Sequence, residues 1–264
     1  MAQAREKNFC KALRKFTQKL PSSYTARMTT IGICDSGVGG LTTLKILKQN
    51  FPSAHFYYLS DNKNMPYGTK SKEELADICS SLLKKLKAHS DIQVIACNTA
   101  SSLINDEDVI KLLPPAILGN TLVMATPMTI SRLKEVEAFQ NKYIVFSDTP
   151  ELATLVEVYT SVGVRKNCLN MRELLPYLAD KLFEFKGVDN VVLGCSHYLY
   201  LKNEISKILG AVNFCDGNSN IVKALGKLLS QESGQGSVTF DFTADDESKK
   251  YSAILALLEK DDTL

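Results

Sequence analysis

The chain has 264 residues, of which 45% are apolar and 23% charged, with a formal net charge of +2, as expected for a globular protein of one large or two small domains. No apolar run reaches the roughly 18 to 20 residues of a membrane span, which argues against a membrane-spanning protein. No secretory signal follows the N-terminus, which argues against secretion. The seven cysteines are scattered, odd in number and without a CxxC pair, so they favour a reducing cytoplasm over a disulfide framework or a zinc knuckle.

The first 27 residues are strongly basic, with seven Lys or Arg residues against a single Glu, a local charge of +6. Four apolar residues within them recur at helical spacing before Pro21. They are Phe9, Leu13, Phe16 and Leu20. This N-terminal extension is compatible with a tail docked on its own domain, a surface for an anionic ligand or partner, or an organelle-targeting segment. Met28 is an alternative start.

From residue 29 onward, short apolar runs alternate with longer segments of helical periodicity, such as 72–89. The apolar runs are 31–35, 56–60, 92–96, 121–125, 142–147, 189–194 and 211–215. Strands that are apolar on both faces, separated by amphipathic helices, predict an α/β fold with parallel sheets covered on both sides. The strands are too many for one small sheet, so we expect two lobes, with the chain passing from the first to the second near Pro114, Pro115 and Gly119.

Ligands of such folds bind beyond the carboxyl ends of the strands, so the loops there are the candidate site. The first of these loops is DSGVGG at 35–40, where a strand gives way to a helix. Its glycines would let backbone N–H groups face an anion. It is neither a Walker loop nor a dinucleotide fingerprint, because Thr42 stands where the last glycine of GxGxxG would fall.

The second loop contains the sequence MPYGTKSKEE. Pro66 fixes a turn, Tyr67 offers a hydroxyl group, and Gly68 permits an unusual backbone angle. Ser71 and Glu74 have the spacing of a capping box at the start of the next helix.

The third loop follows a strand in VIACNTASS, where Cys97, Asn98 and Thr99 precede a helix predicted over 100–112. A thiol near a helix N-terminus is expected to have a lowered pKa and to act as a base near neutral pH. The alternative is a cysteine that packs as a small buried apolar residue.

The same design recurs in VVLGCSHYLYL, where Cys195, Ser196 and His197 follow a strand. A redox pair would normally show CxxC spacing, a metal site would need further ligands, and a single nucleophile would need only one such loop. Two thiols facing one substrate carbon could instead remove a proton from one side and supply one to the other, which inverts the centre.

Four motifs in this order, between Met28 and about Asp216, resemble those of glutamate racemases in the cofactor-independent aspartate/glutamate racemase superfamily. They are DSGVGGLT, PYGTKS, ACNTAS and GCSHY. The resemblance implies two pseudosymmetric lobes with the active site in the cleft between them, a first lobe of 28–117 plus 212–264 and a second of 118–211. It implies interconversion of L- and D-glutamate for peptidoglycan, without pyridoxal phosphate, other cofactor or metal, by a cytoplasmic homodimer.

Transferred by position, the resemblance makes Cys97 and Cys195 the catalytic acid/base pair, with Asp35 and His197 tuning or relaying protons. It implies that the substrate is bound by Asp35, Ser36, Tyr67, Gly68, Asn98, Thr99, Ser196 and His197. Ser196 keeps the hydroxyl of the family's usual threonine. Glu157 falls near a family acidic residue that would orient the substrate ammonium, although an exposed helix carboxylate is an alternative interpretation.

One region departs from the family pattern. The chain between ACNTAS and VMATPMT is short, and a usual segment resembling GVIEPG plus a helix is absent or reduced to AILGN. Such a change could alter lobe closure, dimer contacts or activity. Two alternatives therefore stay open: a racemase of aspartate or a hydantoin, and a catalytically impaired racemase-like binding protein that uses its N-terminal helix as a contact surface.

Overall fold

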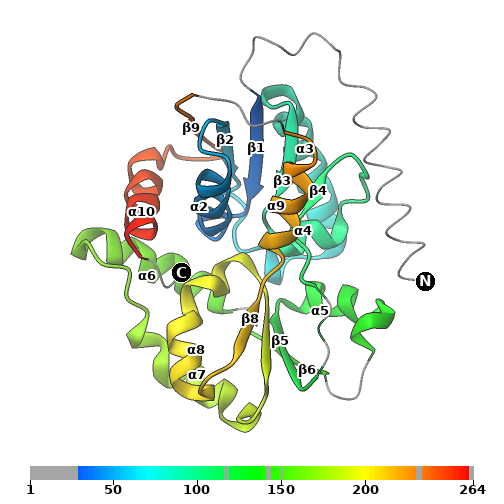
Figure 1. The fold of residues 1–264 in the computed structure, drawn as a ribbon, viewed down its shortest axis with the longest axis vertical. Coiled ribbons are helices and arrows are strands. Elements are labelled where there is room, and N and C mark those ends of the chain that lie inside the picture. The colour runs from blue at the N-terminus through cyan, green and yellow to red at the C-terminus, as the bar shows by residue number, and fades with distance from the viewer. Residues whose placement is uncertain are drawn as a thin grey trace.

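The computed structural model of the chain (Figure 1) consists of two α/β lobes, each built on its own sheet. It describes residues 29–115, 117, 119–140, 144–149, 151–229 and 234–261. The amphipathic stripe expected within residues 1–27 lies outside these ranges. None of the helices in these ranges is long and apolar enough to cross a membrane.

The first lobe contains a five-stranded parallel sheet in the order β4-β3-β1-β2-β9. Its strands are β1 (Thr30–Asp35), β2 (His55–Ser60), β3 (Ile92–Ile95), β4 (Ile110–Lys111) and β9 (Ser237–Phe242). Its helices are α2 (Gly40–Asn50), α3 (Lys72–His89), α4 (Asn98–Leu103), α9 (Asn218–Gly226) and α10 (Ser248–Lys260), with the 3₁₀ turn η1 (Tyr67–Thr69).

Alternating side chains of β1 and β2 fill two separate cores in this lobe. Ile31 and Tyr58 pack with α2, α9 and α10, whereas Cys34 and Leu59 pack with α3 and α4. A strand that is covered on both faces must be apolar at every position, which explains why these runs carry no polar alternation.

The second lobe contains a four-stranded parallel sheet in the order β6-β5-β7-β8. Its strands are β5 (Thr121–Ala125), β6 (Ile144–Asp148), β7 (Asn190–Gly194) and β8 (Asn213–Cys215). Its helices are α5 (Pro127–Lys134), α6 (Glu151–Lys166), α7 (Leu175–Leu182) and α8 (Lys202–Leu209), with four 3₁₀ turns: η2 (Glu137–Phe139), η3 (Arg172–Leu174), η4 (Phe183–Phe185) and η5 (Ser196–Leu201). The expected α/β fold with parallel sheets is thus confirmed.

Two details differ from the sequence prediction. The helix predicted over 100–112 covers only Asn98–Leu103, because a turn-forming run follows in which Asp106 accepts a hydrogen bond from the Asp108 N–H group. The chain returns to the first sheet after Cys215 rather than at residue 212, because β8 pairs with β7.

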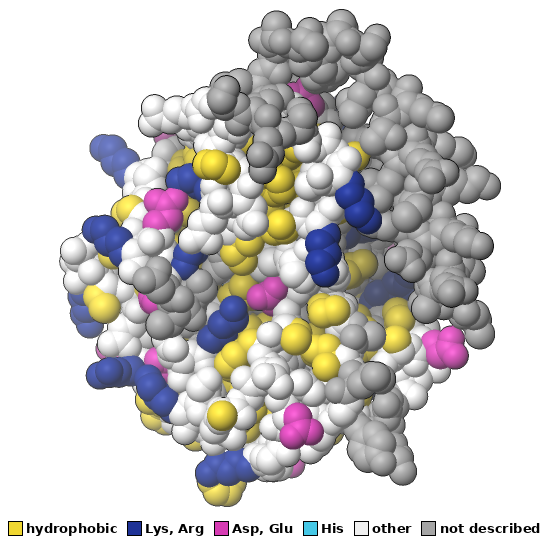
Figure 2. Space-filling model, viewed as in Figure 1, with side chains coloured by type: hydrophobic (Ala, Val, Ile, Leu, Met, Phe, Trp, Pro, Cys, Tyr) yellow, Lys and Arg dark blue, Asp and Glu magenta, His cyan; other side chains and the backbone are white. Residues whose placement is uncertain are grey.

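The two connections between the sheets touch each other. Residues 112–120 lead from β4 to β5 and contain no helix in their described part, and residues 216–217 lead back toward α9. Gly217 has a φ of 92°, and a Cβ there would lie 2.4 Å from the carbonyl oxygen of Leu113. On the face shown in Figure 2, charged side chains of both signs are interspersed with apolar ones over the described surface.

Candidate active site

The two cysteine stretches meet where the lobes face each other. Cys97 follows β3 of the first lobe, Cys195 follows β7 of the second, and both thiols line one buried cavity of about 10 Å³. Nine of the eleven predicted site residues line this thiol cavity. They are Ser36, Tyr67, Gly68, Cys97, Asn98, Thr99, Cys195, Ser196 and His197. The other two, Asp35 and Glu157, lie directly behind it, hydrogen-bonded to Ser196 and His197.

Cys97 sits in a buried environment that opposes ionisation. Its Sγ atom lies 3.8 Å from Ser36 Oγ, and only 5% of the residue is exposed. Burial, assisted by the negative charge of Asp35, raises the pKa of this thiol, and the Ala100 N–H group offsets only part of the rise. The expected lowering of the pKa is therefore wrong for this arrangement, because desolvation outweighs the start of a helix only six residues long.

Cys195 has a different neighbourhood, in which an imidazole stands beside the thiol. Its Sγ atom lies 4.0 Å from His197 Nδ1, and His197 Nε2 lies 2.9 Å from Glu157 Oε1. Burial by itself would lower the pKa of His197, but the hydrogen bonds and negative charges of Cys195 and Glu157 raise it well above its ordinary value. The imidazole of His197 is therefore held between the Cys195 sulfur and the Glu157 carboxylate.

Glu157 is a buried residue of α6, with 7% exposure, so it is not an exposed helix carboxylate. Its Oε1 accepts a hydrogen bond of 2.6 Å from the Val38 N–H group in the first lobe, as well as contacting His197. Burial would raise the pKa of Glu157, but its contacts with His197, Val38 and Lys250 lower it. The carboxylate therefore carries its charge in the space between the lobes.

The glycine loop at 35–40 receives side chains of the second lobe. A Cβ at Gly37 would lie 1.9 Å from Glu157 Oε1, and a Cβ at Gly39 would lie 2.4 Å from Ser196 Oγ and 2.6 Å from His197 Nδ1. We expected this loop to direct its N–H groups toward an anion. The anion that its Val38 N–H group binds is the protein's own Glu157 carboxylate.

Asp35 links the same two lobes from the end of β1. Its Oδ2 accepts a hydrogen bond of 2.9 Å from Ser196 Oγ, and its Oδ1 accepts one of 2.8 Å from the Gly37 N–H group. Burial raises the pKa of Asp35, although the neighbouring His197 and these hydrogen bonds oppose the rise. Asp35 thus influences Cys97 in its own lobe and contacts Ser196, the neighbour of Cys195, in the other lobe.

Several polar groups of the cavity already have protein partners. The Tyr67 hydroxyl donates to Asp61 Oδ2 at 2.6 Å, and Asn98 Nδ2 donates to the carbonyl oxygen of Leu112. Asn98 Oδ1, in contrast, is buried and finds no hydrogen-bond partner among the described residues. Such an acceptor is costly to bury unless a ligand donates to it.

Sequence reasoning missed Thr126 and Asp61. Thr126 lines the thiol cavity, and its Oγ1 lies 2.9 Å from Thr99 Oγ1. It directly follows the fully buried strand β5, and a search for polar residues just after predicted strands, which identified the two cysteines, could also have found it. Within the described ranges, no group of three or more His, Cys, Asp and Glu side chains is arranged to hold a metal ion.

Comparison with known proteins gives a consistent picture, although no family model matches the chain. Glutamate racemase of Clostridium acetobutylicum is 34% identical over 217 residues, which cover 75% of this chain and 83% of that protein. Glutamate racemase of Halothermothrix orenii is 30% identical over 262 residues, covering 87% and 99%.

Solved structures of glutamate racemases share the fold. The enzyme of Thermus thermophilus, in complex with β-chloro-D-alanine, matches with a TM-score of 0.71 at 26% identity, covering 87% of this chain and 93% of that one. The enzyme of Campylobacter jejuni matches with a TM-score of 0.70 at 24% identity, covering 86% and 98%, a likeness of fold. With two thiols at matching strand ends of two lobes and relatives at these identities over most of their length, the chain belongs to the glutamate racemase family of isomerases.

Proposed function

We propose that this chain interconverts L-glutamate and D-glutamate, with Cys97 and Cys195 as the two acid/base groups. The observation that carries the proposal is that thiols from two different sheets line one buried cavity. They lie close enough for the charge of Cys195 to raise the pKa of Cys97. A single cavity between two thiols is what proton removal on one face and proton delivery on the other requires.

The proposed reaction consists of two proton transfers. One cysteine, as thiolate, takes the proton from the α-carbon and becomes a thiol, leaving the electron pair on the carbon and the α-carboxylate. The other cysteine, as thiol, donates its proton to the opposite face and becomes a thiolate. The product has the inverted configuration, and the two cysteines have exchanged protonation states.

The two thiols have different charged neighbours. At Cys195, the neighbouring imidazolium of His197 supplies positive charge. At Cys97, burial and Asp35 raise the pKa, so the charge must come from the substrate. An α-ammonium group bound at the unpartnered Asn98 Oδ1, which lines the same cavity, would supply that charge and favour the thiolate.

The remaining cavity groups suit the two carboxylates of glutamate. The hydroxyls of Ser36, Thr99, Thr126 and Ser196 can donate to carboxylate oxygens, and Tyr67 and Gly68 line the same space. We assign Glu157 to His197 rather than to the substrate, because it does not line the thiol cavity and its oxygens already contact protein groups.

Substrate access requires movement, because a space of about 10 Å³ holds about one water molecule. We divide the chain into a first lobe up to about residue 117 and from residue 216 onward, and a second lobe between them. We propose that these lobes separate to admit glutamate, pivoting where Leu113 meets Gly217. The resemblance supports a cytoplasmic homodimer that supplies peptidoglycan synthesis with D-glutamate.

The test is to incubate the purified protein with L-glutamate in deuterium oxide. We expect D-glutamate to accumulate until the enantiomers are equal, with solvent deuterium at the α-carbon of the product. If no D-glutamate forms and no deuterium enters the α-carbon, the proposal is contradicted and the impaired, racemase-like alternative is supported. L-aspartate and a hydantoin in parallel reactions separate glutamate from the other substrates, since faster exchange with either would reassign the enzyme.

A further inference from the structure

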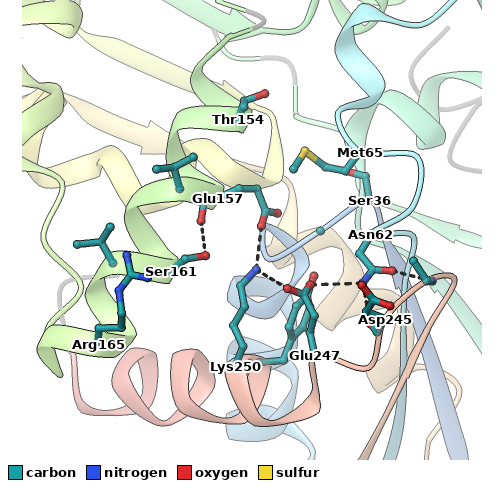
Figure 3. Close-up of a pocket in the computed structure, with 15 residues that line it drawn as sticks. Ser36, Asn62, Met65, Thr154, Glu157, Ser161, Arg165, Asp245, Glu247 and Lys250 are labelled. Atoms are coloured by element: carbon teal, nitrogen blue, oxygen red, sulfur yellow. Dashed lines mark hydrogen bonds and ion pairs between the residues drawn. The ribbon is translucent and has the colours of Figure 1, made fainter.

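Lys250 reaches across the interface between the lobes to the carboxylate behind the active site. It lies on α10 and borders an open pocket of about 480 Å³ between α6 and α10 (Figure 3). Its Nζ atom lies 3.8 Å from Glu157 Oε2 and 2.9 Å from Glu247 Oε1. A quarter of its side chain is exposed, compared with 9% for that of Glu157.

The two oxygens of Glu157 have separate partners. Oε1 contacts His197 Nε2 at 2.9 Å and accepts the Val38 N–H group at 2.6 Å, whereas Oε2 faces Lys250. His197 in turn stands 4.0 Å from the sulfur of Cys195 through its other ring nitrogen. A continuous chain of charged and polar groups therefore runs from α10 of the first lobe to one of the two thiols.

We propose that Lys250 is a positioning residue for the reaction: its ammonium group keeps Glu157 ionised, and the ionised Glu157 holds His197 oriented toward Cys195. This inference rests on the proposed racemase function. It is supported by the lowered pKa of Glu157, to which Lys250 contributes after His197 and Val38. It adds a residue of α10 to a site otherwise built from strand ends, the segments after them and Glu157 of α6.

Other charged or titratable groups face the series of side chains that runs from Lys250 through Glu157 and His197 to Cys195. Around Glu157 they are His197 and Tyr200 of η5, Tyr58 of β2, and Lys250 and Tyr251 of α10, whereas Asp35 of β1 faces His197. Of these groups, only His197 and Lys250 can carry positive charge. Glu247, which precedes α10, competes with Glu157 for the Lys250 ammonium.

The effect will appear in the pH dependence of the rate. The equilibrium constant of a racemisation is unity, so any change in kcat/KM must be the same for both enantiomers and cannot reveal which thiol is affected. Removing the Lys250 ammonium group raises the pKa of Glu157 and disfavours every negative charge in the series from Glu157 to the thiol. The acid limb of kcat/KM, which reports the groups of the free enzyme, therefore moves to higher pH.

The experiment compares the pH profile of kcat/KM for the full-length wild type and four variants. In Lys250→Met the acid limb should shift upward by about half a pH unit, and Lys250→Arg should restore it. Glu247→Gln should shift the acid limb to lower pH, because the Lys250 ammonium then has Glu157 as its remaining carboxylate partner in this pair. The matched control is Arg165→Met, which removes an exposed cation from the wall of the same pocket and should leave the profile unchanged.

Each outcome decides the inference. An unshifted profile in an active Lys250→Met variant would overturn it while leaving the racemase function intact. A wild type that does not racemise glutamate would instead contradict the proposed function, and the inference would fall with it. Should Lys250→Met not fold, Glu247→Gln decides alone: a downward shift supports the role of Lys250, and an unshifted profile overturns it.

Discussion

The two thiols of the cavity differ in what stands beside them. Cys97 faces the neutral hydroxyl of Ser36 with the carboxylate of Asp35 nearby, whereas Cys195 faces His197. A racemase needs one thiolate and one thiol at any moment, and identical surroundings would not favour either arrangement. His197 stands beside Cys195 and not beside Cys97, so the two proton-transfer groups are not equivalent.

Replacing either cysteine should stop full racemisation. We expect Cys97→Ala and Cys195→Ala each to lower kcat by at least about 1,000-fold, because each removes the proton donor or acceptor on one face. The measurement is circular dichroism of the glutamate pool over time. Cys168→Ala, at an exposed cysteine of the second lobe, is the control and should retain wild-type activity. Retained activity in both cavity variants would contradict the two-thiol mechanism.

The absence of a side chain at Gly37 is expected to be essential. A Cβ there would lie 1.9 Å from Glu157 Oε1, so Gly37→Ala should displace the carboxylate and, with it, His197. We expect a loss of about 1 to 3 kcal/mol in the free energy of unfolding and a large fall in kcat. Urea denaturation and the racemisation assay measure the two effects.

The control for Gly37→Ala is Gly226→Ala, at the exposed end of α9, where an added Cβ meets nothing within 4 Å. It should leave activity unchanged and stability equal or slightly higher. Equal behaviour of the two variants would show that the Gly37 contact is unimportant.

At the residue level, the sequence predicted which side chains gather but not how they behave. Motif order was enough to place Cys97, Cys195 and their polar neighbours on one cavity. The raised pKa of Cys97 could not be read from the sequence, because it depends on burial and on Asp35, 62 positions away along the chain. The same holds for Glu157, whose partner Val38 lies 119 positions away.

At the level of elements, apolar strands were predictable and polar or short ones were not. All seven apolar runs form strands, within a few residues of the predicted ends. β4 has only two residues, and β9 is an edge strand of sequence SVTFDF with no fully buried position, so neither shows the continuous apolar pattern. The early end of α4 depends on a local Asx turn rather than on periodicity.

The Ser71 N-cap at the start of α3 makes a prediction at this scale. Ser71 Oγ accepts a hydrogen bond of 3.1 Å from the Glu74 N–H group, as its spacing predicts. Ser71→Ala should lower the free energy of unfolding by about 1 kcal/mol, because a first-turn N–H group loses its partner. Urea denaturation measures this loss, and kcat should not change. Ser71→Asp, which restores an acceptor, should recover the stability, and a stable Ser71→Ala protein would show that this cap contributes nothing.

At the scale of the whole molecule, the lobes are joined by polar contacts near the site. Ser196 donates to Asp35, Val38 donates to Glu157, and the Tyr200 hydroxyl donates to the Val38 carbonyl oxygen. The sequence predicted two lobes but not these contacts, since each joins residues more than 100 positions apart. The same contacts also hold Asp35, Ser196 and Glu157 beside the thiol cavity, so the joining of the lobes and the arrangement of the site depend on the same residues.

The Glu157–His197 pair gives this closed arrangement a pH dependence. The pKa of Glu157 is lowered from its ordinary value of 4.5, so its contribution to stability is complete above pH 4.5 and is lost as the pH falls through the lower folded value. The pKa of His197 is raised from 6.5, so its contribution is complete below pH 6.5 and is lost as the pH rises through the higher folded value. The pair therefore stabilises the fold most between about pH 4.5 and 6.5.

Glu157→Gln tests this window, because it removes the charge of the carboxylate and leaves the shape nearly unchanged. We expect the free energy of unfolding to fall by about 3 kcal/mol relative to wild type between pH 4.5 and 6.5, and the difference to shrink at higher and lower pH. Urea denaturation at a series of pH values gives the comparison. Glu184→Gln, at an exposed carboxylate of the second lobe, is the control and should show no such window. A difference that does not vary with pH would mean that Glu157 acts by shape and hydrogen bonding alone, and that its charge does not hold the lobes together.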